Sequence, residues 1–216
     1  MKLSIITFAC ALLFNSAVEA AETRMLMKNM KKQGKGKKGG KEDDDTEYTT
    51  IMAKFSGDYV SGSAYFMQDS SKYTDGWWVV ELDEVDMSGL GGCPTGLNWH
   101  IHEFTLGDGR TECTDLGGHW DPTYGCAGAS QHQASGVCPL LYPDLGGVKS
   151  CDPEADITTC EMGDLSGKMG QLSFKTGVMQ KFEDVYMTNI DVISSLSIVI
   201  HCGAPRVACG NFYAKA

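Results

Sequence analysis

Residues 99–104 read Trp99-His100-Ile101-His102-Glu103-Phe104, and the fold prediction starts from this stretch. Successive side chains of a β-strand point to opposite faces, so in a strand His100 and His102 share one face while Ile101 points into the core. Their Cβ atoms would then lie roughly 7 Å apart, close enough for both imidazoles to bind one metal ion. The stretch therefore predicts a strand that carries a pair of metal ligands.

Short alternating runs of the same kind recur along the chain after residue 50. Thr50 to Ser56, for example, alternates Ile51, Ala53 and Phe55 with more polar neighbours. Runs of this length, bounded by Gly, Asp and Ser, are typical of strands. Seven or eight of them favour an all-β fold, a Greek-key antiparallel β-barrel or sandwich. The predicted strands cover residues 50–56, 59–67, 77–82, 98–104, 170–174, 185–190 and 197–201.

Residues 105–168 show little periodicity, and we expect long loops there that are stapled by disulfides. The stretch carries five of the nine cysteines of the chain. Loss of a signal peptide would remove Cys10 and leave eight, an even number that suits full pairing in an oxidising compartment. The sequence alone leaves the pairing open. The five cysteines of this stretch are Cys113, Cys126, Cys138, Cys151 and Cys160.

The two ends of the chain differ sharply from its middle. Residues 1–20 are typical of a secretory signal, with Lys2, an apolar run and small residues before a cleavage point after Ala20, so we expect a secreted protein with no membrane span after cleavage. Residues 21–49 are expected to form a disordered linker, first basic and then acidic, because seven lysines fall between Lys28 and Lys41. Such a tail either contacts a polyanionic surface or is a solvated tail or propeptide.

Charge separates the predicted domain, residues 50–216, from this tail. The 216-residue chain has a net charge of -10, but from residue 42 onward 9 Lys and Arg face 26 Asp and Glu, a net of -17. Nucleic-acid binding requires a clustered basic face, so the domain is not expected to bind nucleic acid. The length suits one folded domain with extensions.

The other histidines of interest lie in motifs of their own. His119 belongs to Gly118-His119-Trp120-Asp121-Pro122, and His201 ends the apolar run 196–201. Together with the 99–104 stretch, Gly163-Asp164-Leu165 and Arg206-Val207-Ala208-Cys209-Gly210, these fragments resemble the copper/zinc superoxide dismutases. Their order and rough spacing agree with that family over residues 50–213.

The resemblance implies a Greek-key β-barrel, a copper cofactor and superoxide as the substrate. The position of Arg206 matches an arginine that attracts and orients the superoxide anion, and a permanently charged guanidinium suits that role. The resemblance also implies a disulfide between Cys113 and Cys209, and it gives the His119 position the task of bridging copper to zinc. The implied copper ligands are His100, His102, His119 and His201.

The zinc site departs from the family pattern. Asp164 matches a zinc ligand, but Glu161 stands where a histidine is expected, and the only candidate for the remaining histidine is His132, 13 residues after His119. Only four residues separate His201 from Arg206, so the long charged loop of the family is absent. Both departures resemble the extracellular copper-only branch. There Glu161 would hydrogen-bond the far nitrogen of His119 and orient the ring.

The sequence therefore predicts a secreted, copper-dependent superoxide dismutase with an incomplete zinc site and no bound zinc. One alternative is a full copper/zinc enzyme whose rebuilt zinc site uses His119, His132, Asp164 and Glu161. Another is a secreted copper-binding module of the same fold without catalysis, because sandwiches and barrels host many functions.

Overall fold

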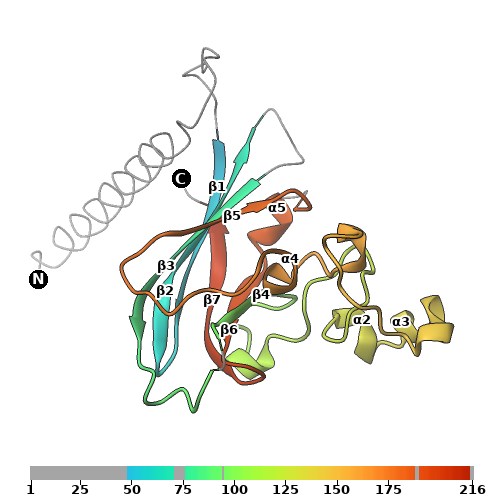
Figure 1. Ribbon diagram of the computed structural model, residues 1–216, viewed down its shortest axis with the longest axis horizontal. Helices are drawn as coiled ribbons and strands as arrows, with labels where there is room; N and C mark the ends of the chain where they lie inside the picture. The colour runs from blue at the N-terminus through green and yellow to red at the C-terminus, as the bar shows by residue number, and fades with distance from the viewer. Residues whose placement is uncertain (1–47, 71–75, 94, 188–189, 215–216) are drawn as a thin grey trace, which may run out of the picture. The chain divides into compact units, whose positions relative to one another are not determined.

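The computed structural model describes residues 48–70, 76–93, 95–187 and 190–214, which form a predominantly antiparallel β fold (Figure 1). The predicted signal peptide and most of the predicted linker lie outside the described residues. Seven strands form one sheet in the order β4-β6-β7-β1-β2-β3-β5. The strands are β1 (Tyr48–Ser56), β2 (Val60–Asp69), β3 (Gly76–Val85), β4 (Asn98–His102), β5 (Gln180–Asp184), β6 (Ser197–His201) and β7 (Arg206–Ala214).

The pairing confirms the predicted all-β Greek-key class. Consecutive strands β1, β2 and β3 pair as antiparallel neighbours, whereas β7 pairs with both β6 and β1. The chain then crosses from β3 to β4 at the opposite edge of the sheet, so segments distant in sequence meet beside β4.

Helical segments are short. They are α2 (Gln131–Ala134), α3 (Val137–Leu141), α4 (Leu165–Met169), α5 (Ile190–Ile193) and the 3-10 turns η1 (Cys113–Asp115), η2 (Pro143–Leu145) and η3 (Ile157–Thr159).

Two of the predicted strands are wrong. Residues 170–174 form only an isolated bridge, in which Leu97 and Leu172 exchange backbone hydrogen bonds of 2.9 Å in both directions. The predicted strand 185–190 is not formed by its described residues: the Asp184 carboxylate accepts the backbone N–H groups of Tyr186 and Met187 and turns the chain. Strands β5 and β7 were not among the predicted runs. In β7 the burial pattern does not alternate cleanly.

The core lies between the strands and the segments that cover them. The predicted inward set Ile51, Ala53 and Phe55 is buried, and so is Ile101, which confirms the assigned face of the 99–104 stretch. Aromatic rings fill the centre, with Trp78 in edge contact with Trp99 at 5.7 Å between centroids. Full burial of such side chains supplies a large part of the hydrophobic stabilisation.

Residues 105–168 are loop-rich, as predicted, and disulfides staple them. All eight cysteines of the described residues are paired, as Cys93–Cys202, Cys113–Cys209, Cys126–Cys138 and Cys151–Cys160. Two of these bridges close short loops within 105–168, and one joins that region to β7. Within the described residues, no helix has the length and apolar character needed to cross a membrane.

Candidate metal centre

Backbone pairing beside β4 brings the separate motifs together. The Ile101 N–H donates to Gly163 O at 2.9 Å, the Trp120 N–H donates to Ile101 O at 2.8 Å, and the Gly163 N–H donates to Trp120 O at 2.8 Å. A Cβ at Gly163 would lie 2.6 Å from Ile101 O, so this close approach requires glycine. The ring of hydrogen bonds places His119 and Asp164 next to the strand that carries His100 and His102.

Four buried imidazoles converge at this point. His100 and His102 share one face of β4, His201 ends β6 opposite Asn98, and a backbone bridge joins His102 to His119. The ring centroids of His100 and His119 lie 4.0 Å apart, and those of His100 and His201 lie 4.7 Å apart. One nitrogen from each of the four rings lies within 4.8 Å of the other three. The four residues are only 1–8% exposed, so the cluster is shielded from bulk water.

Hydrogen bonds assign the protons of two of these rings. Nδ1 of His102 lies 3.0 Å from Gly117 O, and Nδ1 of His201 lies 3.2 Å from Ala204 O. A carbonyl oxygen only accepts, so each Nδ1 carries the proton and each Nε2 presents a lone pair. These two Nε2 atoms are 3.4 Å apart. Two facing lone pairs repel each other unless a cation or a shared proton lies between them.

The other two rings complete the set of free nitrogens. Nδ1 of His119 lies 2.5 Å from Glu161 Oε2 and leaves Nε2 available. Nδ1 of His100 is buried and has no hydrogen-bond partner among the described residues. A buried polar atom without a partner is rare in native proteins and calls for an explanation. A metal ion bound at His100 Nδ1 and three Nε2 atoms would account for it.

Burial keeps these imidazoles in the form that binds metal. It lowers the pKa of His102 to about 2 and that of His201 to about 3, because a charged ring loses its solvation there. Burial also lowers the pKa of His100. Three of the rings are therefore neutral at physiological pH, and neutral imidazole suits copper and other late transition metals.

Two carboxylates lie behind the imidazoles. Glu161 is fully buried, and burial raises its pKa although the hydrogen bond from His119 opposes the rise. Its Oε1 atom has no partner among the described residues. Asp164 caps α4 by accepting the Gly167 N–H at 2.8 Å, and its Oδ1 lies 3.4 Å from His100 Nε2. Burial alone would raise the pKa of Asp164, but hydrogen bonds from His100 and from the Gly167 N–H hold it below its usual value.

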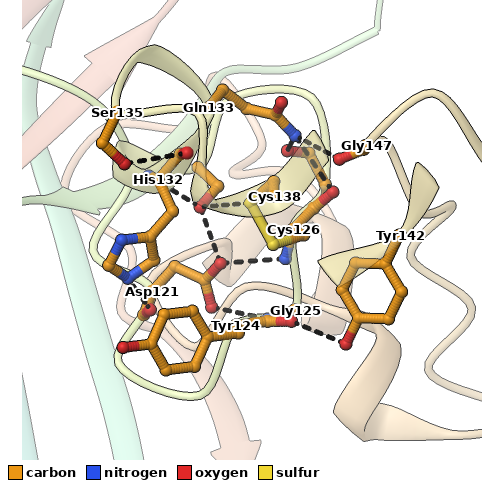
Figure 2. Close-up of a disulfide and its surroundings, with 12 residues drawn as sticks. Asp121, Tyr124, Gly125, Cys126, His132, Gln133, Ser135, Cys138, Tyr142 and Gly147 are labelled. Carbon is orange, nitrogen blue, oxygen red and sulfur yellow. Dashed lines mark hydrogen bonds between the residues drawn. A yellow bond between two sulfur atoms is a disulfide. The ribbon is translucent and has the colours of Figure 1, made fainter. Parts of the chain in front are cut away.

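The structure does not bring His132 into this group. His119, Glu161 and Asp164 each offer a ligand atom within 4.8 Å of the others, and His132 is not part of the set. Instead, the His132 ring stacks on Tyr124 at 4.5 Å, and its Nε2 lies 2.9 Å from the backbone oxygen of Asp121 (Figure 2). The rebuilt zinc site that included His132 is therefore not assembled in this structure.

Arg206 lies at the start of β7 and is held by two carbonyls. It donates from Nη1 to Cys113 O at 2.7 Å and from Nη2 to Gly117 O at 2.6 Å. Cys113 is bonded to Cys209 of β7, the pair that the resemblance implies. The same Gly117 oxygen accepts from His102, so one peptide group orients both the guanidinium and a ring of the imidazole cluster.

Sequence reasoning missed the groups that orient these side chains. The acceptors on Gly117, Ala204 and Cys113 are backbone oxygens, which have no residue signature. The only available signal was the Gly117-Gly118 pair before His119, since Gly117 adopts a φ of 74° that disfavours other residues. Two side chains were also missed: Ser166, whose hydroxyl bonds the backbone of Trp99, and Asp121, whose carboxylate accepts from Gly125 N, Cys126 N and Ser130 Oγ.

Comparison with known proteins identifies the fold. Two solved structures of variants of superoxide dismutase 5 from Candida albicans match with a TM-score of 0.52 and 19% sequence identity. The matches cover 77% and 79% of this chain and 91% and 92% of the dismutase chains. No protein-family model and no curated protein sequence matches. At this identity the likeness shows a superoxide dismutase-like fold.

Proposed function

We propose that the chain is a secreted, copper-dependent superoxide dismutase in which Glu161, rather than zinc, partners His119. The reaction converts two superoxide anions and two protons into O₂ and hydrogen peroxide. The observation that carries the proposal is the convergence of four imidazole nitrogens within 4.8 Å in a buried cluster. The four disulfides support secretion, because such bonds persist in oxidising compartments.

The donor set fits copper. His100 would bind through Nδ1, which is otherwise an orphaned buried atom, and His102, His119 and His201 would bind through Nε2. The opposite nitrogens of His102, His119 and His201 are engaged with Gly117 O, Glu161 and Ala204 O, so these rings are oriented before any metal arrives. Such outer contacts fix the ring angle and the tautomer of a ligand. When bound, copper would supply the one-electron redox chemistry.

Arg206 would bind and orient the substrate. Its guanidinium is fixed by Cys113 O and Gly117 O, and these bonds leave other N–H groups of the fork available to an anion. Because the same Gly117 oxygen also orients His102, the guanidinium keeps a set position relative to the imidazoles. Superoxide would thus meet a local positive charge beside the cluster, although the domain as a whole is negative.

Glu161 would keep a proton on Nδ1 of His119, the ring nitrogen opposite the proposed copper ligand atom Nε2. With its Oε2 accepting from His119 Nδ1, the carboxylate keeps the ring in one orientation and directs Nε2 toward the other three imidazoles. If Nε2 takes up a proton during turnover, the nearby carboxylate stabilises the resulting imidazolium. The second proton for the product would come from water.

A copper/zinc enzyme is the alternative that one observation favours. His119, Glu161 and Asp164 offer three ligand atoms within 4.8 Å, and Glu161 Oε1 has no partner among the described residues. Against this alternative, His119 Nδ1 already contacts Glu161 at 2.5 Å, and His132 supplies no fourth ligand. Zinc there would have to displace the hydrogen bond between His119 and Glu161.

Metal analysis of the purified secreted protein, combined with the rate of superoxide decay after pulse radiolysis, tests the proposal. We expect about one copper per chain, no stoichiometric zinc after dialysis against both metals, and rapid catalysed decay. One zinc per chain beside copper would establish the copper/zinc alternative. Bound copper without catalysis would leave a copper-binding module, and a protein that binds no copper would refute the function altogether.

A further inference from the structure

The loop that follows His119 has an unusual backbone. Tyr124 and Cys126 adopt φ angles of 57° and 53°, in the left-handed region that residues other than glycine rarely occupy. Such conformations persist only where the surrounding structure holds them in place. Residues 121–130 therefore need anchors, and the structure provides two fully buried ones.

The first anchor is the carboxylate of Asp121. This side chain is 0% exposed and accepts three hydrogen bonds: from Gly125 N at 2.8 Å, from Cys126 N at 2.9 Å and from Ser130 Oγ at 2.7 Å. Figure 2 shows the carboxylate between the two arms of the loop. Hydrogen bonds to an ionised acceptor are stronger than those between neutral groups, so Asp121 fixes both ends of the strained segment.

The second anchor is the disulfide between Cys126 and Cys138, both of which are completely buried. It ties the loop to α3. Beside it, the Gln133 amide donates to Cys126 O at 3.2 Å, to Ala127 O at 3.1 Å and to Gly147 O at 2.8 Å. The Asp121 carboxylate and the two sulfur atoms lie within 4.8 Å of one another, but the sulfurs are bonded to each other. The cluster therefore serves as a covalent anchor rather than as a metal site.

Both anchors act on His119 through the loop that they hold. Its backbone N–H donates to Ala129 O at 2.8 Å, and its backbone oxygen accepts from Gln131 N at 3.1 Å. The end of the anchored loop and the first residue of α2 thus hold the two peptide groups of His119. Displacement of that loop end would change the direction of the imidazole and its 2.5 Å contact with Glu161.

We propose that Asp121 and the Cys126–Cys138 disulfide are positioning groups for His119, which they hold through the loop 121–130. The inference rests on the proposed role of His119 as a copper ligand. In this chain the disulfide would help to fix His119, whose Nδ1 contacts the Glu161 carboxylate instead of a second metal ion. Breaking the disulfide should loosen His119 while the other three imidazoles stay in place.

The test compares two disulfide deletions in the full chain. The variant C126A/C138A removes the proposed positioning bond, and C151A/C160A removes the neighbouring bridge, which closes a loop of similar length in the same region. In the metal-free protein, imidazole NMR signals report the proton shared by His119 and Glu161. We expect this signal to shift or broaden in C126A/C138A and to stay unchanged in C151A/C160A.

Copper release gives a second readout. Loss of an outer contact of a metal ligand commonly weakens metal binding by about 10- to 100-fold, so we expect copper to leave C126A/C138A at least about tenfold faster than C151A/C160A. Asp121→Asn, which keeps the disulfide, should change the same NMR signal and provides the test if C126A/C138A does not fold. Unchanged NMR signals in every folded variant of the Asp121 and Cys126–Cys138 anchors would overturn the proposal. The NMR test needs no dismutase activity, so its result is independent of the proposed function.

Discussion

A single oxygen atom, the carbonyl of Gly117, links the arginine to the imidazole cluster. It accepts from Arg206 Nη2 at 2.6 Å and lies 3.0 Å from His102 Nδ1. Gly117 has a φ of 74°, and a Cβ there would lie 2.3 Å from the Glu103 carboxylate, which itself accepts the Gly118 N–H. Backbone conformation and lack of space together require glycine at this position.

Gly117→Ala should therefore impair the site more than the fold. We expect the free energy of unfolding to fall by about 1–3 kcal/mol, the usual range for a strained backbone position. The folded variant should also turn over superoxide more slowly than the unmodified protein, because its Gly117 oxygen is displaced. Gly128→Ala is the matched control, because nothing lies within 4 Å of its Cβ position. Denaturant unfolding and pulse radiolysis measure the two effects. Equal activity in both variants would show that the Gly117 oxygen does not orient the site.

Arg206→Glu tests the local positive charge. Reversal of this charge should slow the reaction with superoxide by about tenfold or more, which corresponds to about 1.4 kcal/mol of activation free energy. Copper content should stay unchanged, because Arg206 binds backbone oxygens and is not one of the four clustered imidazoles. Arg206→Lys keeps the charge and should retain part of the rate. If Arg206→Glu turned over superoxide as fast as the unmodified protein at low salt, the assigned role would be refuted.

The stability of the metal-free protein should depend on pH. The pKa of His102 is about 2 and that of His201 about 3 in the folded protein, against 6.5 as the ordinary value. The unfolded chain therefore binds more protons below pH 6.5, and the folded state loses about 1.4 kcal/mol per pH unit for each group as the pH falls. The raised pKa of Glu161 opposes only part of this loss.

Denaturant unfolding of the metal-free protein between pH 7.5 and pH 5 measures this dependence, with the copper-loaded protein as the comparison. Bound copper keeps the same imidazole nitrogens unprotonated in the folded protein, so it should raise the free energy of unfolding without reducing this dependence. A pH-independent unfolding free energy in the metal-free protein would mean that the imidazoles are not buried in neutral form.

At the scale of elements, α4 joins the two edges of the sheet. Ser166 exchanges hydrogen bonds with the backbone of Trp99 in edge strand β4, at 2.5 Å from Trp99 N and 3.1 Å to Trp99 O. In the last turn of α4, Lys168 Nζ donates to the Asp184 carboxylate of the opposite edge strand β5 at 2.8 Å. Both side chains are 1% exposed. We call the Ser166–Trp99 and Lys168–Asp184 contacts the α4 clasp. Since Asp164 caps the same helix and lies near His100, the clasp also supports the site.

Lys168→Met should release the clasp. It would leave the buried Asp184 carboxylate without its cation, and breaking a buried ion pair costs about 3–5 kcal/mol. The double variant Lys168→Met/Asp184→Asn keeps an acceptor for Trp78 Nε1 and removes the charge, so it should recover part of the loss. Lys149→Met is the control, because the Lys149 ammonium lies over the Tyr142 ring and interacts with Asp156 through its charge rather than through a buried ion pair. Thermal unfolding of the three variants measures these losses of stability. Equal losses of stability in Lys168→Met and Lys149→Met would contradict a stabilising role of the Lys168–Asp184 pair.

Strands were predictable where an apolar or alternating run of residues is bounded by turn-forming residues. The run 197–201 matches β6, and the runs near residues 50, 60 and 77 differ from β1, β2 and β3 only at their ends. Strand β7 lacks a regular alternation of buried and exposed residues, and β5 ends where the Asp184 side chain turns the chain. The histidine motifs could be read from the sequence, but their backbone acceptors and the anchors of loop 121–130 depend on tertiary contacts.

At the scale of the whole molecule, the net charge opposes the approach of the proposed substrate. From residue 42 onward the net charge is -17, and superoxide is an anion, so long-range forces should repel it while Arg206 should attract it locally. Salt screens the distant charges more than the near one, because the Debye length falls to about 8–10 Å at ionic strengths of about 0.1–0.15 M. The chain should therefore bind its substrate faster, not slower, as salt is added.

Pulse radiolysis across a salt series measures this effect. We expect the second-order rate constant to rise by roughly twofold between about 10 mM and 150 mM ionic strength, as the screening length contracts toward the size of the site. Two salts with anions that do not bind copper separate screening from specific anion effects. In Arg206→Glu the rise should be steeper, because no local attraction remains to be weakened by salt. A rate constant that fell with salt in the unmodified protein would instead indicate a positively charged approach to the copper site that outweighs the charge of the domain.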